Sequence, residues 1–231
     1  MLYIINGKVV TMEGPIWEKG YVCIAEGKIK ELGPMEEGAP FLRNESVDTQ
    51  IIDATGCIVM PGFIEAHCHM GITEEKKGME GDDCNECVNP ITPYLRAIDA
   101  INPMDAAFDD ALRAGITSAM IGPGSANVVG GTFAFVKTHG RKIDDLIVKN
   151  PAAMKIAFGE NPKVNYSGQG KSPSTRMATA AMLREELFKA SAYYEKVKQG
   201  IAQEDRDFRY ECWLPVFKGE IPLKAHVHRA D

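Results

Sequence analysis

The chain has 231 residues, of which 45% are hydrophobic and 25% are charged, as in an ordinary globular protein with one or two cores. Its net charge of −6 argues against nucleic acid as a partner, because phosphate binding requires a basic surface. No apolar run approaches the roughly 20 residues of a membrane span. The N-terminus has no positive region before its apolar residues, and the six cysteines show no disulfide pattern, so we expect a cytoplasmic protein with reduced thiols.

Residues 1–60 are expected to form a small all-β module. Short β-rich runs occupy residues 2–5, 8–11, 21–25, 28–32, 51–53 and 57–60. Asn6-Gly7 and Glu26-Gly27 each separate two neighbouring runs, and both dipeptides predict a hairpin turn. Residues 33–50 are polar and rich in glycine, proline and glutamate, which is typical of a loop.

From Pro61 onward, strands alternate with helices, which is the pattern of parallel βα units. The predicted strands cover residues 63–69, 115–121, 132–137, 152–158 and 223–228. Asn102-Pro103 supplies a cap and a first helical position for one helix, which ends at Gly115, and a longer helix is predicted over residues 175–199. The polar residues 70–93 predict a loop over the mouth of a barrel.

Two His-x-His pairs stand at the ends of predicted strands. Side chains alternate between the two faces of a strand, so His67 and His69 share one face at the end of the first strand. Two imidazoles on one face are a pair of metal ligands, and an ordinary strand edge is the alternative reading. His226 and His228 repeat the pattern at the end of the fifth strand, which chance clustering explains poorly.

The stretch IDATGCIVMPGFIEAHCH, residues 52–69, resembles the signature of the metal-dependent amidohydrolase superfamily, in particular its imidazolonepropionase-like and dihydroorotase-like hydrolases. The resemblance implies an α/β fold in which a small β-sandwich accompanies a TIM-type (β/α)8 barrel. In this chain, residues 1–60 would form part of the sandwich. Residues 61–231 would form the N-terminal part of the barrel, with about five strands, since a whole barrel takes about 250 residues.

The resemblance also implies one or two divalent metal ions, held by His67, His69 and a histidine of strand five. We favour His226 for that role and place His228 in the second shell or in contact with substrate, although the order of the two could be reversed. In two-metal members, a strand-four lysine carboxylated by CO2 bridges the ions, and Lys155 occupies the matching position. A lysine inside an apolar strand is unusual, and a snorkelling lysine is the alternative.

Two further residues are weaker candidates for this site. Glu160 follows strand four and is a rival to Lys155 as the ligand from that strand. Asn127 lies in a glycine-rich loop, where it could contact substrate. Cys84 and Cys87 form a Cys-x-x-Cys motif, but a structural zinc site needs four ligands and no second pair stands nearby. We interpret them as two loop thiols.

The implied chemistry is hydrolysis of a non-peptide C–N bond in a small molecule, such as an amide, cyclic amide or amidine, by metal-activated water. We favour zinc, but manganese, iron and nickel accept the same ligands. The family also uses a histidine on strand six and a proton-shuttling aspartate on strand eight. Asp231 lies three residues after His228 and does not match that aspartate, so the catalytic acid–base residue is unassigned.

We therefore expect a truncated amidohydrolase, that is, a fragment of a larger enzyme. Two alternatives remain open at the level of sequence. The chain could be one half of a split hydrolase completed by another chain, or a non-catalytic remnant that binds a metal or another ligand. The expected partners are a small-molecule substrate and either a second copy of the chain or a complementing chain, with neither nucleic acid nor membrane involved.

Overall fold

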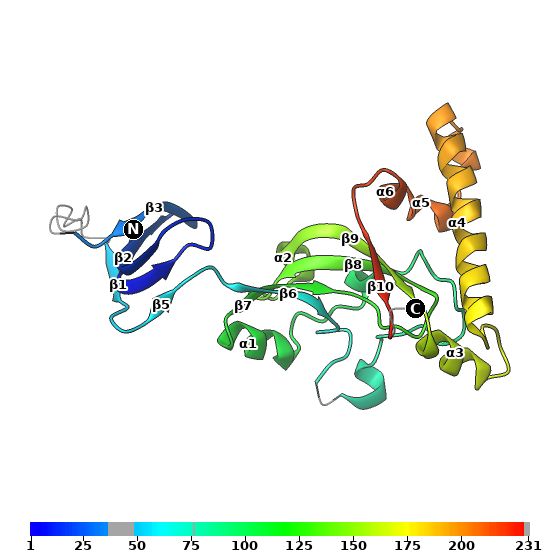
Figure 1. The fold of residues 1–231 in the computed structure, drawn as a ribbon, viewed down its shortest axis with the longest axis horizontal. Helices are drawn as coiled ribbons and strands as arrows, with labels where there is room; N and C mark the ends of the chain where they lie inside the picture. Colours follow the sequence, from blue (N-terminus) through cyan, green and yellow to red (C-terminus); the bar gives the residue numbers. More distant parts are fainter. Residues whose placement is uncertain (37–48, 76, 229–231) are drawn as a thin grey trace. The chain divides into compact units, whose positions relative to one another are not determined.

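The computed structural model describes residues 1–36, 49–75 and 77–228 of the chain. The chain divides into two compact units, Met1–Gly62 and Phe63–Asp231, which Figure 1 shows as two separate sheets with their own connections. Within the described ranges, no helix combines the length and the apolar composition that crossing a membrane requires.

The first unit is a five-stranded sheet. Its strands are β1 (Leu2–Val10), β2 (Ile16–Ala25), β3 (Lys28–Pro34), β4 (Gln50–Asp53) and β5 (Ile58–Val59). The order is β3-β2-β1-β4, with β5 also pairing with β1, and β1 runs antiparallel to β2 but parallel to β4 and β5. Tyr3, Tyr21 and Cys23 form its small core. The small all-β module expected at the N-terminus is present.

The two predicted hairpins have different outcomes. Glu26 and Gly27 both have positive φ and join β2 to β3, so that hairpin is confirmed. The hairpin at Asn6 is wrong, because β1 continues through this residue with a positive φ and a shift in its register with β2. Asn6 donates to the Asp53 carboxylate at 3.0 Å, and a Cβ at Gly7 would lie 2.7 Å from Val59. Asn6-Gly7 therefore forms a bulge in β1, at which Asp53 of β4 and Val59 of β5 approach β1 closely.

The loop expected over residues 33–50 falls largely on residues 37–48, which lie outside the described residues, as does Asp231. Gly33 and Pro34 belong to β3.

The second unit contains a five-stranded sheet that curls into a half-barrel (Figure 1). Its strands are β6 (Phe63–Cys68), β7 (Ile116–Ile121), β8 (Val129–Lys137), β9 (Ile147–Ala157) and β10 (Leu223–His226), in the order β10-β9-β8-β7-β6. Each corresponds to one predicted strand. The predicted α/β class, with a partial barrel after a β module, is confirmed.

The expectation that every strand of the barrel is parallel is wrong at β8. This strand runs antiparallel to both β7 and β9, while β6–β7 and β9–β10 are parallel pairs. A parallel neighbour needs a crossover of about a dozen residues or more, whereas an antiparallel neighbour accepts a short link. Only residues 122–128 join β7 to β8, and they contain no helix.

Helices cover the outside of this sheet and occupy its connections. They are α1 (Ala106–Arg113), α2 (Ile143–Leu146), α3 (Glu160–Ser167), α4 (Arg176–Gln199), α5 (Phe208–Glu211) and α6 (Leu214–Phe217), with short 3-10 turns at Gly78–Gly81, Ala97–Asp99 and Gln203–Asp205. Helix α1 begins later than predicted, because Asp105 rather than Asn102 is its cap. Helix α4 begins at the Thr175 cap and ends at Gly200, as predicted.

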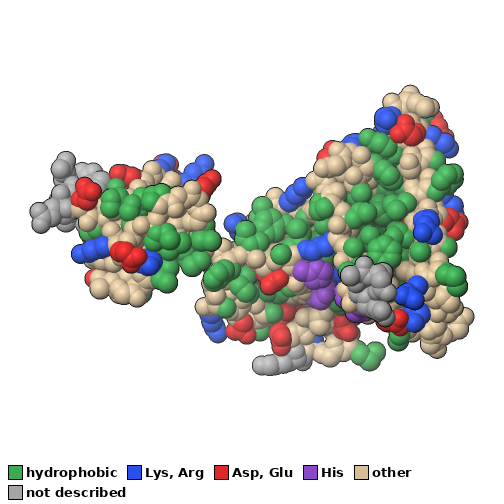
Figure 2. All heavy atoms as spheres, in the orientation of Figure 1, with side chains coloured by type: hydrophobic (Ala, Val, Ile, Leu, Met, Phe, Trp, Pro, Cys, Tyr) green, Lys and Arg blue, Asp and Glu red, His purple; other side chains and the backbone are tan. Residues whose placement is uncertain are grey.

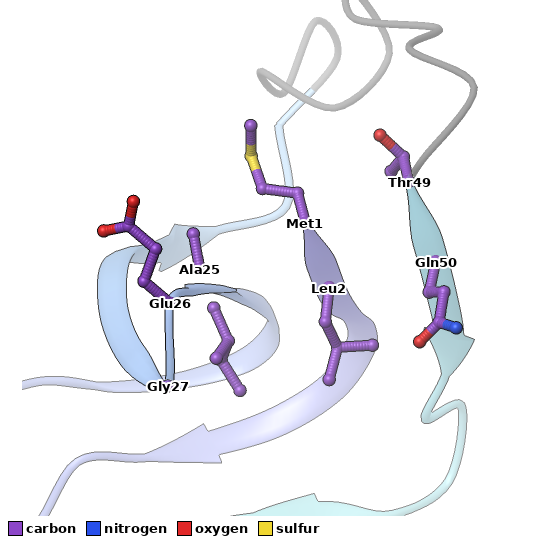
Figure 3. Close-up of a pocket in the computed structure, with 8 residues that line it drawn as sticks. Met1, Leu2, Ala25, Glu26, Gly27, Thr49 and Gln50 are labelled. Atoms are coloured by element: carbon purple, nitrogen blue, oxygen red, sulfur yellow. The ribbon is translucent and has the colours of Figure 1, made fainter.

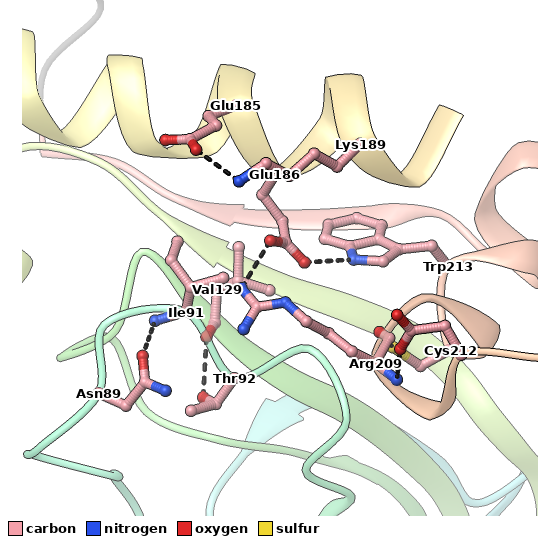
Figure 4. A network of polar contacts seen from close by, with 11 residues as sticks. Asn89, Ile91, Thr92, Val129, Glu185, Glu186, Lys189, Arg209, Cys212 and Trp213 are labelled. Carbon is pink, nitrogen blue, oxygen red and sulfur yellow. Dashed lines mark hydrogen bonds and ion pairs between the residues drawn. The ribbon is translucent and has the colours of Figure 1, made fainter. Parts of the chain in front are cut away.

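A buried carboxylate attaches α4 to the segment that follows it. Glu186 is 3% exposed, and its oxygens accept from the Arg209 guanidinium at 2.6 Å and from the Trp213 indole at 3.1 Å (Figure 4). Trp213 is fully buried, together with Leu183 and Ala190 of α4. These contacts pack the helical layer against one face of β9.

Candidate metal centre

Side chains from four strands, β6, β8, β9 and β10, meet on one wall of the half-barrel. Lys224 of β10 pairs in register with Lys155 of β9, so both lysines share a face, and His226 follows on that face two residues later. The Lys155 and Lys224 ammoniums lie 5.8 and 4.9 Å from the Phe133 ring centroid. The His67 ring lies 5.4 Å from the same centroid. Figure 2 shows histidine side chains gathered on this unit with lysine or arginine beside them.

Lys155 and His67 lie side by side in this cluster. Lys155 Nζ lies 3.5 Å from His67 Nε2, and Lys155 is 0% exposed. Burial lowers the pKa of Lys155 to about 8; the charge of Lys224 acts in the same direction, and Cys84 opposes it. Burial and then the two lysine charges lower the pKa of His67 to about 4. Near pH 7 the His67 ring is therefore neutral and has a lone pair to give to a metal.

His69 is held by the backbone at the end of β7. Its Nδ1 lies 2.7 Å from the Gly122 carbonyl oxygen, so Nδ1 carries the hydrogen and Nε2 keeps the lone pair. Cys84, followed by the bond to Gly122, raises the pKa of His69, although burial opposes them. A backbone carbonyl that orients a histidine in this way is common at metal sites.

The spacing of the first histidine pair suits a shared ion. The His67 and His69 ring centroids are 5.4 Å apart, with their planes at 87°. Two imidazoles on one tetrahedral ion have centroids about 5 Å apart, since zinc–nitrogen distances are near 2.0–2.1 Å. However, in the described part of the chain, no three His, Cys, Asp or Glu side chains converge closely enough to hold an ion. Lys155 lies beside this pair, with its Nζ 3.5 Å from His67 Nε2.

The second histidine pair lies at the end of β10. His226 Nε2 and His228 Nε2 are 3.2 Å apart, and His228 lies just beyond the strand, which is two residues shorter than predicted. Burial, Lys155, His228 and His69 together lower the pKa of His226. His226 lies on the same face of the sheet as Lys224 and Lys155, and Lys155 lies beside His67.

Glu160 and Asn127 lie elsewhere. Glu160 is the first residue of α3, and its carboxylate pairs with Lys163 at 2.7 Å while more than half exposed. Asn127 is buried, and its amide donates to the backbone oxygens of Glu86 and Asn89 at 2.8 and 2.9 Å. The structure thus engages Glu160 in a surface ion pair and Asn127 in holding the 86–89 loop.

Two residues of this cluster were missed by the sequence interpretation. Lys224 stands two residues before His226 on the same face, and its ammonium also donates to the Ala66 carbonyl oxygen. Its period-two relation to His226 is a signal that the sequence does contain. Cys84 is buried and raises the pKa of His69, whereas Cys87 is exposed. No pattern in the neighbouring sequence distinguishes the buried Cys84 from the exposed Cys87.

A cavity of about 470 Å³ lies in the first unit, at the end of the hairpin formed by β2 and β3 (Figure 3). Its lining includes Leu2, Gly27 and Gln50, with Glu26 as its only carboxylate among the described residues. It offers neither a histidine nor a cysteine to a metal, so we do not assign the chemistry to it.

Known proteins resemble this chain in sequence and in fold. An amidohydrolase of known structure from Thermotoga maritima MSB8 is 37% identical, with a TM-score of 0.90 over 100% of this chain and 59% of that chain. Amidohydrolase tasK of Hapsidospora irregularis is 28% identical over 208 residues, covering 80% of this chain and 21% of tasK. A 5-methylthioadenosine/S-adenosylhomocysteine deaminase of Syntrophobacter fumaroxidans is 38% identical over 74 residues, covering 31% of this chain and 16% of the deaminase.

The chain thus spans about a fifth of the length of tasK and 59% of the Thermotoga chain. No family model matches it. The resemblance to amidohydrolases is confirmed over the N-terminal portion of such proteins.

Proposed function

We propose that this chain carries the metal-binding side of a hydrolase site for non-peptide C–N bonds. The premise is that the chain has the sequence and fold of the N-terminal portion of amidohydrolase-superfamily proteins. In this proposal, residues 1–60 are the β module and residues 61–231 the barrel portion. The observation that carries it is the cluster of His67, His69 and Lys155 on the concave face of the half-barrel.

We assign the histidine ligands to His67, His69 and His226. His67 is neutral near pH 7, and His69 is oriented by Gly122 so that Nε2 is available. When bound, a divalent ion supplies a Lewis acid and activates water at neutral pH. His228, 3.2 Å from His226, orients that ring from outside the ligand set.

Lys155 is the proposed bridging residue after carboxylation. A free ammonium is only a donor and cannot ligate a cation, whereas a carbamate presents oxygens. The neutral amine attacks CO2, a C–N bond forms, and one proton leaves to solvent. The lowered pKa of Lys155 favours the neutral amine, and the nearby Lys224 ammonium offers a counter-charge to the carbamate.

The substrate class that we propose is a small amide, cyclic amide or amidine. The names amidohydrolase and deaminase both describe hydrolysis of C–N bonds, and they belong to the relatives above. We favour zinc as the ion, because it accepts imidazole and carboxylate-type ligands in one site.

Metal content by elemental analysis tests this proposal. The purified protein, prepared with zinc and bicarbonate and then desalted, is compared with a His67→Ala/His69→Ala variant. We expect near-stoichiometric metal in the parent protein and loss of it in the double variant. His139→Ala is the matched control, because His139 is exposed and lies on a separate turn. Equal metal content in the parent and the double variant would refute the assignment.

A second candidate function is metal or ligand binding without catalysis. It requires only that the first histidine pair, whose ring centroids lie 5.4 Å apart, retain an ion. Turnover of simple amides and amidines by the metal-loaded protein distinguishes the two functions. Activity that appears only after a complementing chain is added would identify one half of a split hydrolase.

A further inference from the structure

One peptide group at the proposed metal centre, the one that joins Ala66 to His67 in β6, is held by charged side chains. Its carbonyl oxygen accepts from the Lys224 ammonium of β10. Its N–H donates to the Glu65 carboxylate at 2.9 Å. The pairing of β6 with β7 shifts its register between Glu65 and Cys68, on either side of this peptide. Side chains thus bind both polar atoms of the peptide at a point where the strand ladder is irregular.

The Lys224 side chain reaches this peptide across the concave face of the half-barrel. β10 and β6 are the two outermost strands in the order β10-β9-β8-β7-β6, so the contact joins opposite ends of the sheet. The Lys224 ammonium also lies 4.9 Å from the centroid of the Phe133 ring in β8. The His67 ring lies 5.4 Å from the same centroid. One lysine therefore contacts both the backbone that carries His67 and the aromatic ring beside which His67 lies.

The charge of Lys224 is unfavourable at this place unless the lysine has another role. A positive side chain repels a divalent cation bound nearby, and Lys155 already brings one amine to the same face. A hydrogen bond from an ammonium to a carbonyl is stronger than one between neutral groups, so it can hold a peptide firmly. Metal sites require their ligands within about 0.5 Å of the correct position, and the direction of a side chain follows from the peptide that carries it.

We propose that Lys224 is a positioning residue, which together with Glu65 fixes the Ala66–His67 peptide and so directs the His67 imidazole toward the metal. The inference rests on the proposed function, because it presupposes an ion at the first histidine pair. Charge and positioning predict opposite effects of removing Lys224. Loss of a positive charge alone would strengthen the binding of a cation, whereas loss of the bond to Ala66 would weaken it.

Cobalt affinity decides between these two effects. The metal-free protein is titrated with Co²⁺ without bicarbonate, so that Lys155 carries no carbamate, and the visible absorption is recorded. The affinity should fall by roughly 10–100-fold in Lys224→Met, as is typical when a partner that orients a ligand is lost. Lys224→Arg keeps a donor and the charge, and it should retain most of the affinity. The matched control Lys137→Met removes an exposed lysine and should leave the affinity unchanged.

NMR of the metal-free protein separates this inference from the function beneath it. A nuclear Overhauser effect between the His67 and Phe133 rings should be present in the parent and in Lys224→Arg, and weaker in Lys224→Met. If the parent binds no cobalt but the ring contact still depends on Lys224, the proposed function fails and the hold of Lys224 on His67 is supported. An unchanged or higher cobalt affinity in Lys224→Met would overturn the positioning role and leave the histidine centre intact.

Amide hydrogen exchange of the unaltered protein avoids the risk that a variant misfolds. The His67 N–H should exchange slowly, because the Glu65 carboxylate binds it and the bond from Lys224 prevents rotation of the peptide. Exchange as fast as that of an exposed, unbonded amide would contradict the inference.

Discussion

Replacement of Lys155 by methionine is expected to stabilise the metal-free protein at neutral pH. Lys155 is 0% exposed, and its ammonium lies on an apolar wall beside Phe133 with the Lys224 charge nearby. Its pKa falls from 10.5 to about 8, chiefly because burial disfavours the charged form. Methionine has a similar length and no charge, so it removes this unfavourable burial.

The size of the effect depends on pH. The unfolded chain keeps the ordinary pKa of lysine, so between pH 8 and pH 10.5 it binds more protons than the folded chain does. The stability of the parent protein therefore rises with pH across this window and is lowest below pH 8. A shift of this size corresponds to about 3 kcal/mol at pH 7 and about 1 kcal/mol at pH 10.

Urea unfolding at pH 7 and at pH 10, in chelator and without bicarbonate, measures this difference. Lys155→Met should exceed the parent protein in the free energy of unfolding by about 2–3 kcal/mol at pH 7, with a smaller gain at pH 10. The exposed Lys137→Met is the matched control and should stay within about 0.5 kcal/mol. A Lys155→Met variant that is less stable than the parent at pH 7, or a gain independent of pH, would refute the reasoning. The expected gain at pH 7 would show that Lys155 is retained for function rather than for stability.

Two further predictions concern named contacts. Glu186→Gln should lower the free energy of unfolding by about 1–3 kcal/mol in urea titrations, because the bond to the half-exposed Arg209 loses its charge. The control Glu185→Gln breaks only an exposed ion pair and should change the free energy of unfolding by less than about 1 kcal/mol. Equal effects of Glu186→Gln and Glu185→Gln would contradict the burial argument. In the metal-free protein, NMR titration of the His67 imidazole should give a pKa of about 4. Lys224→Met should raise this pKa, because the substitution removes a positive charge that disfavours the protonated ring. An unchanged pKa would exclude Lys224 as a cause.

Local patterns determined much of this protein. The alternation of side chains on a strand placed His67 with His69, and the capping residues Thr175 and Gly200 set the bounds of α4. The succession of strands and helices after Pro61 gave the α/β class and the five strands of the half-barrel. In each case, the determining interactions lie within a few residues along the chain, so the sequence alone contains them.

Contacts between distant segments were decided only by the tertiary structure. The direction of β8 follows from the short link that precedes it and from its pairing with β9. In the first unit, Asn6 forms a bulge because Asp53 and Val59 approach β1. The burial of Cys84 depends on how a long loop returns to the end of β7, where the Cys84 carbonyl accepts from the Gly124 amide. Such contacts depend on the closure of loops and on the space left by neighbouring strands. No short segment of the sequence contains this information.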